Sequence, residues 1–289
     1  MTKKTYMAFV LPILVVFTLV VIVPFVIGII YSFTNWNGIS SEFNFVGIKN
    51  FMKAFGDAKF MSSLQLTIVY AIVNVVLVNL IGLGFALLVT SKIKTKLIAR
   101  GAFFFPNLIG GLILGFTWQF IFSQIMPALN DLINAGGASS VFFNWLTNPT
   151  FAFIAICVVS AWSGSGYVMI IYIAALESIS DTIIEAAMID GANKINTFFR
   201  IKLPLIMSGV TMSLFITISN SLKIYDLNLS LTKGGPYEST EMATMNIYNE
   251  AFGYTNFGFA QAKSIIFFIL IMVVTLVQLS ITRRKEVEL

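Results

Sequence analysis

The sequence predicts an all-α membrane protein with six transmembrane helices, because it combines abundant apolar residues, few charges and several long apolar runs. Hydrophobic residues make up 57% of the 289 positions, and charged residues make up only 11%. A soluble domain of this length needs far more charge to cover its surface. A helix needs about 20 apolar residues to cross the hydrocarbon core of a bilayer, and stretches of that length recur along the chain.

The apolar runs place the six spans in one transmembrane domain that occupies residues 1–289. We expect the spans at about 7–31, 64–89, 102–122, 151–176, 204–222 and 264–282. The first run follows two lysines, as the apolar region of a secretory signal peptide does. It is too long for such a region, and no small-residue cleavage site follows it, so we expect it to be a retained helix.

Basic residues favour one side of these spans and predict the orientation of the chain. On that side lie Lys3, Lys4, Lys92, Lys94, Lys96, Arg100, Lys194, Arg200, Lys202, Arg283, Arg284 and Lys285. Because cytoplasmic loops carry the excess of Lys and Arg, we expect both termini and the loop 177–203 in the cytoplasm. The segment 223–263 is then external. The formal charge of +5 reflects this orientation rather than nucleic-acid binding.

Histidine and cysteine, which catalysis and metal binding commonly use, are missing from the sequence or nearly so. The chain has no histidine, and its single cysteine, Cys157, lies in an apolar run. The cysteine is expected to be a small buried hydrophobe, and no disulfide within the chain is possible. We therefore expect no catalytic residue, no metal site and no cofactor held by this chain, and a membrane enzyme is the weakest of the function classes considered.

The positions of the acidic residues bear on how transport would be driven. Every Asp and Glu falls outside the six predicted spans or at their ends, and no Lys or Arg lies in the middle of a span. Proton-coupled and many cation-coupled transporters need ionisable groups inside the membrane. The pattern weighs against an ion-coupled secondary transporter, although sodium sites built from carbonyl and hydroxyl groups would escape this test.

A phosphate-binding loop of the form G-x-x-x-x-G-K-[ST] is also missing. If ATP drives transport, another polypeptide must hydrolyse it and must dock on the cytoplasmic side. The loop 177–203 is the one cytoplasmic loop large enough to receive such a partner. Thr182 and Glu185 form a capping-box pattern, which predicts a short helix that starts near Ile183. Gly191 can end this helix.

A second short helix is predicted from about Asn193 to Arg200, and Pro204 opens the fifth span. From the residues alone, the loop could equally be an amphipathic connector that lies on the membrane surface. The signature residues of the loop are Glu185, Ala186, Ala187, Asp190, Gly191, Ile201, Leu203 and Pro204. In kind and spacing they resemble the signature loop of the inner-membrane components of binding-protein-dependent ABC importers.

The resemblance extends over nearly the whole chain and is closest to the sugar-permease branch of that family. The similar segments are 24–34, 45–50, 106–118 and 231–236. They resemble the first of the two maltose permeases, without its large external domain, and the compact multiple-sugar and glycerol-phosphate permeases. The chain has Ile179-Ser180 where the family often has Ile-Pro, and Ser180 can still cap the helix.

The resemblance implies a type I ABC importer permease fold and a set of partners. The loop would be a coupling helix that seats in a cleft of an ATPase subunit, with Glu185 reaching a basic partner and Gly191 permitting the tight turn. It also implies a second related permease, two ATP-binding subunits that hold ATP and Mg, an external substrate-binding protein, and a place in a bacterial cell membrane as a multi-pass protein.

Neutral polar side chains on two spans suggest a path for the substrate. These side chains are Ser160, Ser163, Gly164 and Tyr167 in span four, and Thr217, Asn220, Ser221 and Tyr225 in or after span five. The spacing places the four residues of span four on one helical face, and Thr217, Asn220 and Ser221 on one face of span five, with Tyr225 near its outer end. The same pattern can also reflect close packing of helices, which is the interpretation we favour for the Gly111-x-x-x-Gly115 motif in span three.

A carbohydrate path needs neutral hydrogen-bonding groups and aromatic faces. Together with these side chains, the resemblance implies the permease of an ATP-driven carbohydrate importer, with an oligosaccharide as the expected substrate. Glycerol 3-phosphate or a related compound is the second candidate, but no Lys or Arg lies within the spans to hold a phosphate.

Overall fold

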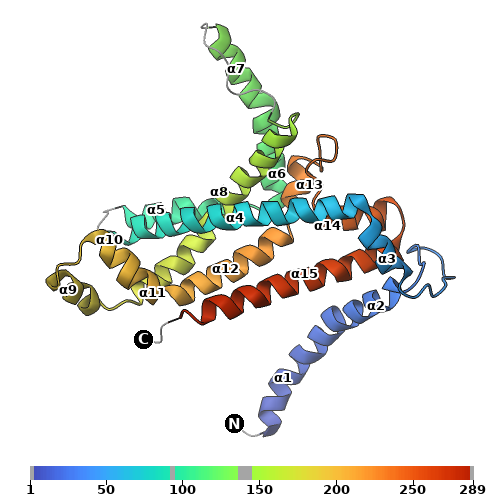
Figure 1. The fold of residues 1–289 in the computed structure, drawn as a ribbon, viewed down its shortest axis with the longest axis horizontal. Helices are drawn as coiled ribbons and strands as arrows, with labels where there is room; N and C mark the ends of the chain where they lie inside the picture. Colours follow the sequence, from blue (N-terminus) through green and yellow to red (C-terminus); the bar gives the residue numbers. More distant parts are fainter. Residues whose placement is uncertain (1–2, 92–94, 136–144, 287–289) are drawn as a thin grey trace. The chain divides into compact units, whose positions relative to one another are not determined.

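The computed structural model describes residues 3–91, 95–135 and 145–286. Within these ranges every regular element is a helix, and one isolated bridge pairs Thr34 with Phe45 (Figure 1). The predicted all-α fold is confirmed. Lys92 and Lys94, which contributed to the predicted orientation, lie outside the described residues.

The chain divides into two compact units. Unit one consists of Met1–Ser62 with Asn246–Ile269, and unit two consists of Ser63–Met245 with Leu270–Leu289. Unit one holds α1 (Lys3–Phe17), the π-helix η1 (Thr18–Ile22), α2 (Val23–Ser32), α3 (Lys49–Gly56), η5 (Asn249–Gly253) and parts of α4 (Ala58–Thr90), α14 (Ala243–Tyr248) and α15 (Phe257–Arg283).

Unit two holds the remaining helices and the remaining parts of α4, α14 and α15. They are α5 (Lys96–Phe104), η2 (Phe105–Leu108), α6 (Gly111–Phe120), η3 (Ile121–Ile125), α7 (Met126–Ala135), α8 (Pro149–Glu177), α9 (Asp181–Ile189), α10 (Lys194–Asn196), η4 (Thr197–Lys202), α11 (Leu203–Leu205), α12 (Met207–Leu222) and α13 (Asp226–Leu231).

Five described helical stretches are long and apolar enough to cross a membrane. They are Phe9–Ser32, Ala58–Thr90, Gly111–Leu132, Pro149–Glu177 and Phe257–Arg283. A sixth candidate is the pair Lys194–Leu205 and Met207–Leu222, whose two halves meet at an angle of 69°. Counting this bent pair as one span gives the six spans that the sequence predicts.

The third span differs from the predicted 102–122, because the structure places it at Gly111–Leu132. Pro106 lies in the 3₁₀-helix η2, and Gly110 has an extended backbone with φ of −60° and ψ of 143°. Proline cannot donate the backbone hydrogen bond that a continuing α-helix requires. The apolar run is therefore split between α5 and α6, a break that hydropathy alone does not reveal.

The sixth span starts at Phe257 rather than near 264, so Lys263 lies inside α15 and not in an external loop. Its side chain is only 1% exposed. In unit one, Lys263 Nζ lies 2.8 Å from Asp57 Oδ2 and 2.7 Å from Glu250 Oε2, and it donates a hydrogen bond of 3.1 Å to Asn246 Oδ1. Two carboxylates thus make the buried charge tolerable, and the pairing joins the starts of α4 and α15 to η5.

Asp57 lies between the end of α3 and the start of α4. Burial by itself raises the pKa of this carboxyl, but hydrogen bonds from Lys263 and from the backbone N–H groups of Phe60 and Lys59, together with the Lys263 charge, outweigh it. The pKa of Asp57 therefore lies below its ordinary value of 3.8. The ionised form is favoured because each of these partners donates to it.

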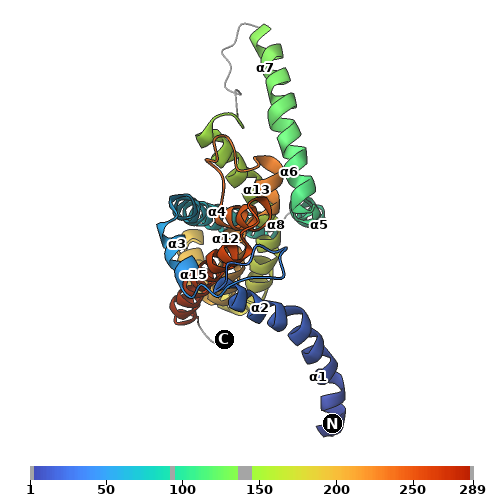
Figure 2. The same ribbon diagram turned by 90° about the vertical axis from the view of Figure 1, so that its right-hand side faces the viewer.

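Glycines set the close approaches between helices in unit two. A Cβ atom at Gly115 would lie 1.8 Å from Ser230 Oγ, and one at Gly111 would lie 2.9 Å from the Asp226 Cβ. Accordingly, α13 packs beside α6 in both views (Figures 1 and 2). The predicted close-packing role of this glycine pair is confirmed.

Gly166 of α8 makes a second close approach, in this case to backbone atoms. A Cβ atom there would lie 2.1 Å from the carbonyl oxygen of Phe103 in α5. Backbone cannot swing aside as a flexible side chain can, so α5 and α8 can pack at this distance only because position 166 lacks a side chain.

Replacing Lys263 by methionine should destabilise unit one strongly. Removing one partner of a buried ion pair costs about 3–5 kcal/mol, because the other charges stay buried without compensation. The thermal midpoint of the purified transporter should therefore fall in K263M. The control is Lys53→Met: Lys53 is exposed and lies 4.0 Å from the Phe259 ring, so its loss should cost less than about 1 kcal/mol.

The pH dependence provides a second check on this ion pair. Because the folded pKa of Asp57 is lowered from 3.8, its stabilising contribution is fully present above pH 3.8 and is lost as the pH falls through the folded value. The wild-type protein should lose this contribution in acid, and K263M should lose less, because only the backbone hydrogen bonds to Asp57 remain in the variant. Equal acid sensitivity of the two proteins would contradict the assignment.

Gly166→Ala should lower the thermal midpoint of the purified protein, because α5 and α8 must move apart to admit the methyl group. Gly84→Ala is the matched control, since Gly84 also lies within a long helix and a Cβ atom there meets no heavy atom within 4 Å. Alanine is favoured over glycine in helices by roughly 1 kcal/mol, so G84A should be neutral or stabilising. Indistinguishable midpoints for G166A and G84A would refute the close-packing argument.

Candidate functional site

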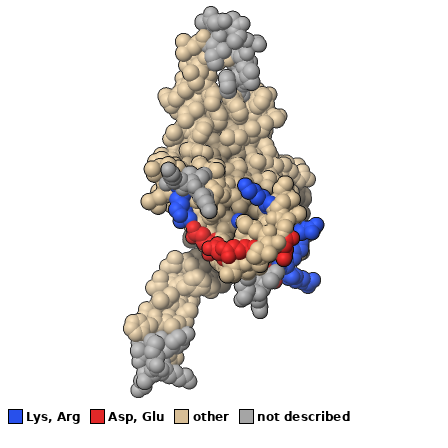
Figure 3. All heavy atoms as spheres, turned by 90° about the vertical axis from the view of Figure 1, so that its left-hand side faces the viewer, with Lys and Arg blue, Asp and Glu red and all other residues tan. Residues whose placement is uncertain are grey.

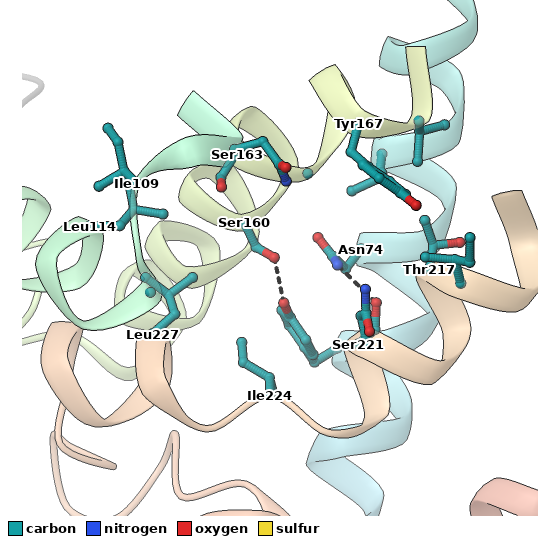
Figure 4. Close-up of a pocket in the computed structure, with 18 residues that line it drawn as sticks. Asn74, Ile109, Leu114, Ser160, Ser163, Tyr167, Thr217, Ser221, Ile224 and Leu227 are labelled. Atoms are coloured by element: carbon teal, nitrogen blue, oxygen red, sulfur yellow. Dashed lines mark hydrogen bonds between the residues drawn. The ribbon is translucent and has the colours of Figure 1, made fainter. Parts of the chain in front are cut away.

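A cavity of about 470 Å³ lies within unit two. Six helices and the segments beside them contribute its lining. The lining residues are Tyr70, Asn74 and Val78 of α4, Asn107 of η2, Ile109, Gly111 and Leu114 in or beside α6, Ser160, Ser163, Gly164, Tyr167 and Val168 of α8, Ile216, Thr217, Asn220 and Ser221 of α12, Ile224 after α12, and Leu227 of α13. None of these lining residues carries a formal charge. Figure 4 shows Asn74, Ser160 and Tyr167 around the same space.

Hydrogen bonds between helices hold several lining side chains in place. Tyr70 donates its hydroxyl to Ser160 Oγ at 2.7 Å, which joins α4 to α8. Asn74 Nδ2 donates to Ser221 Oγ at 2.9 Å, which joins α4 to α12. Both bonds are drawn in Figure 4. The amphipathic faces predicted on the fourth and fifth spans thus meet a polar face of the second span.

The structure brings together all the predicted path residues except one. Ser160, Ser163, Gly164, Tyr167, Thr217, Asn220 and Ser221 line the cavity. Tyr225 is not among the lining residues and precedes the first turn of α13. That substrate passes along this cavity stays a prediction.

The sequence prediction missed the contribution of the second span and of η2. Tyr70, Asn74 and Val78 recur at intervals of four residues and therefore share one face of α4. Two asparagines, Asn74 and Asn79, interrupt this apolar helix. Polar side chains within a span commonly mark function or helix contacts, and this signal could have identified α4.

The polar packing predicted as an alternative role is present beside the cavity. Asn79 Oδ1 accepts hydrogen bonds from the Tyr172 hydroxyl at 2.8 Å and from Ser213 Oγ at 2.7 Å. Asn79 Nδ2 donates to Thr217 Oγ1 at 3.0 Å, and Ser213 Oγ lies 2.8 Å from the Tyr172 hydroxyl. All four side chains are buried, so this cluster ties α4, α8 and α12 together.

The cluster lies between the cavity and the loop 177–203. Tyr172 follows Tyr167 toward the end of α8 at Glu177, and Ser213 precedes Thr217 toward the start of α12 at Met207. Tyr172 and Ser213 therefore lie nearer to the loop along their helices than the lining residues Tyr167 and Thr217 do. The two helices that border the loop are also two walls of the cavity, so a movement of the loop would reach the cavity directly.

The loop forms two short helical arms, α9 and the run from α10 to α11, as predicted. We call this region, residues 181–205, the elbow. The residue that caps the start of α9 differs from the prediction. Ser180, not Thr182, is the N-cap of α9, and its side chain accepts from the backbone N–H of Thr182 at 3.3 Å. A serine two residues earlier in an extended conformation can reach the first free N–H groups, so the helix starts at Asp181 and not near Ile183.

Gly191 ends α9 as predicted, with φ of +79°. The backbone N–H of Ala192 bonds to the Ala187 carbonyl at 2.9 Å, and that of Gly191 bonds to Met188 at 3.1 Å. This pair of bonds is the Schellman arrangement, which needs a left-handed residue at the position of Gly191. The second arm runs without a break from α10 through η4 to α11, beyond the predicted end at Arg200.

The elbow exposes both apolar and acidic side chains. Ile189 is 86% exposed and Met188 63%, and Glu185, Ala186 and Asp190 are also exposed, whereas Ala187 is buried. Figure 3 shows acidic side chains in one band across this end of the molecule, with basic side chains at its ends. Ile201, Leu203 and Pro204 are partly buried in the second arm.

A groove runs beside the elbow and has a volume of about 750 Å³. Its lining is Leu87, Ile184, Met188, Ala192, Asn193, Lys194, Thr197, Phe198 and Lys202. Arg100 of α5 pairs with Glu177 at the end of α8, which fixes the point where α8 meets the elbow.

An uncharged cavity thus lies between spans that an exposed helical elbow connects, an arrangement that suits a membrane transport protein. The model of the binding-protein-dependent transport system inner membrane component family matches residues 78–287. The chain belongs to this family, and the predicted resemblance is confirmed. It is therefore a multi-pass inner-membrane component of an ABC importer, and the ion-coupled alternative is set aside.

Two relatives cover almost the whole chain. The probable starch degradation products transport system permease protein AmyD of Thermoanaerobacterium thermosulfurigenes is 45% identical over 284 residues, which are 98% of this chain and 96% of that protein. The multiple sugar-binding transport system permease protein MsmF of Streptococcus mutans is 33% identical over 264 residues, which are 91% and 90% of the two chains.

A solved structure shares the fold. A chain of a bacterial ABC transporter involved in the import of the acidic polysaccharide alginate superposes with a TM-score of 0.84 at 21% identity, covering 98% of this chain and 96% of that chain. The type I importer fold expected from the sequence is confirmed.

The cluster around Asn79 leads to a stability prediction. Asn79→Leu should lower the free energy of unfolding by about 1–3 kcal/mol, because the buried hydroxyls of Tyr172, Ser213 and Thr217 lose their shared partner. Thermal unfolding of the purified protein measures the loss. Val76→Leu is the control, since Val76 lies on the exposed side of the same helix. The interpretation fails if the two variants unfold at the same temperature.

Proposed function

We propose that this chain is the permease subunit of an ATP-driven importer of a neutral carbohydrate, with an oligosaccharide as substrate. The observation that carries the proposal is the cavity lining, which consists of hydroxyl, carboxamide, aromatic and aliphatic groups without a charge. Such groups suit an uncharged polyol, which gains from hydrogen bonds and apolar contact but little from a fixed charge.

The relatives support this substrate class. AmyD is named for starch degradation products and MsmF for multiple sugars. Starch degradation products are neutral glucose oligomers, in agreement with an uncharged cavity. Glycerol 3-phosphate, the second candidate, would leave its phosphate without a cation from the described lining of this chain.

The coupling mechanism follows from the position of the elbow. ATP and Mg would be bound by separate ATPase subunits, and this chain would contribute no catalytic residue. Glu185 and its exposed neighbours on α9 would seat on such a subunit, so closure of the ATPase pair would displace α9. Because α8 and α12 border the elbow and also line the cavity, the displacement would open the cavity to the other side. A two-state change of this kind needs a contact that differs between the states.

The remaining partners are part of the same proposal. A second related permease would supply the other half of the path, and two ATP-binding subunits would dock on the elbows. An external binding protein would deliver the carbohydrate to the side opposite the elbow. A bacterial alginate ABC transporter of the same fold has been solved in complex with a periplasmic protein that holds an alginate pentasaccharide.

Reconstituted uptake tests the proposal. Liposomes that contain the complete transporter should take up labelled maltotriose only with ATP and the loaded binding protein, and excess glycerol 3-phosphate should not compete. Glu185→Lys should reduce uptake at least tenfold, because a reversed charge on the exposed face of α9 should prevent docking. Asp181→Lys, a matched charge reversal in the first turn of the same helix, should have a smaller effect.

Two outcomes would contradict this function. Uptake that continues without ATP in the Glu185→Lys transporter would indicate another energy source. Competition by glycerol 3-phosphate but not by unlabelled maltotriose would assign the cavity to a phosphorylated substrate.

A further inference from the structure

One side chain in the cavity has a buried hydrogen-bonding atom without a partner. Asn74 of α4 is 6% exposed, and its Nδ2 donates to Ser221 Oγ. Its Oδ1 accepts no hydrogen bond within the described part of the chain. The residue lines the cavity (Figure 4), so this buried, unpaired carboxamide oxygen lies beside the space that we assign to substrate.

Burying this acceptor without a partner costs folding free energy, because burial removes water from the oxygen and no hydrogen bond replaces the one that is lost. Asn79 provides the comparison on the same helix. Its oxygen accepts from Tyr172 and Ser213, and its nitrogen donates to Thr217. The apolar span therefore satisfies a carboxamide where there is no cavity, and leaves one unsatisfied where there is.

We infer that Asn74 is a substrate-binding residue, whose Oδ1 accepts a hydrogen bond from a hydroxyl group of the transported carbohydrate. The inference rests on the proposed function and names a contact that the sequence prediction did not include. A free acceptor in an uncharged cavity requires a donor, and each sugar residue offers several hydroxyl donors. An anionic group would be repelled by the same oxygen, so Asn74 favours neutral substrates.

Ser221 has a positioning role in this arrangement. Because its Oγ accepts from Asn74 Nδ2, the nitrogen side of the carboxamide is occupied and the oxygen is left for the ligand. Ser221 is 2% exposed and lies on α12, one of the helices that border the elbow. Movement of α12 would therefore change the orientation of the Asn74 carboxamide and release the hydroxyl group.

Transport of deoxy sugars tests the inference in the complete transporter. Uptake of maltotriose and of its monodeoxy analogues is measured in liposomes with saturating binding protein, after the affinity of the binding protein for each sugar has been measured separately. Asn74→Ala should reduce maltotriose uptake about tenfold. For the one analogue that lacks the hydroxyl bound by Asn74, wild type and N74A should transport at equal rates.

Asn79→Ala is the control, because a structural defect should reduce the uptake of all analogues by the same factor. Asn74→Ser provides a smaller change if N74A does not assemble, and it should show the same dependence on one hydroxyl. The wild type alone adds a further check, since at least one monodeoxy analogue should be transported more slowly than maltotriose.

The results separate the two proposals. If the wild-type transporter imports maltotriose but the Asn74 variants reduce the uptake of every analogue equally, or of none, the role of Asn74 is overturned and the proposed function stands. If the wild type imports no neutral oligosaccharide, the proposed function is itself overturned.

Discussion

Hydrogen bonds between α4 and α12 are the interaction on which the rest of unit two depends. Asn74 bonds to Ser221, and Asn79 bonds to both Thr217 and Ser213. Inside a bilayer no water competes for these groups, so paired side chains favour one register of the two helices. Ser213, Thr217 and Ser221 are spaced four residues apart, which allows the contact to continue along one face of α12.

The same contacts bear on the proposed substrate site and on the proposed coupling. Near the elbow, the polar groups around Asn79 are hydrogen-bonded to one another. Farther from the elbow, the carboxamide oxygen of Asn74 has no partner within the described residues. Because α8 and α12 continue from the cavity to the elbow, the proposed coupling needs no separate relay between the proposed docking surface and the proposed substrate site. Gly115 of α6 allows α13 to pack closely, and Gly166 of α8 allows α5 to pack closely.

Much of the fold could be predicted because hydropathy and the residues that end helices, such as glycine, are local properties of the sequence. The apolar runs identified the spans, and Gly191 marked the end of α9 because its position requires a positive φ. The predictions were wrong where a local break competes with a continuous apolar run, as at Pro106 and Gly110. They were also wrong for Lys263. A charge by itself indicates a loop, but the carboxylates of Asp57 and Glu250 make the burial of this lysine possible.

The sequence by itself determined the class of the protein, the neutral character of its polar faces and the elbow that links two spans. These follow from residue type, spacing and motif, which need no knowledge of neighbours. Only the tertiary structure decided which polar groups serve packing and which remain free. Asn79 and Asn74 are the same residue type on the same helix, yet the first is fully paired and the second is not. Their difference arises from which side chains of α8 and α12 stand opposite them, and that depends on how the helices pack.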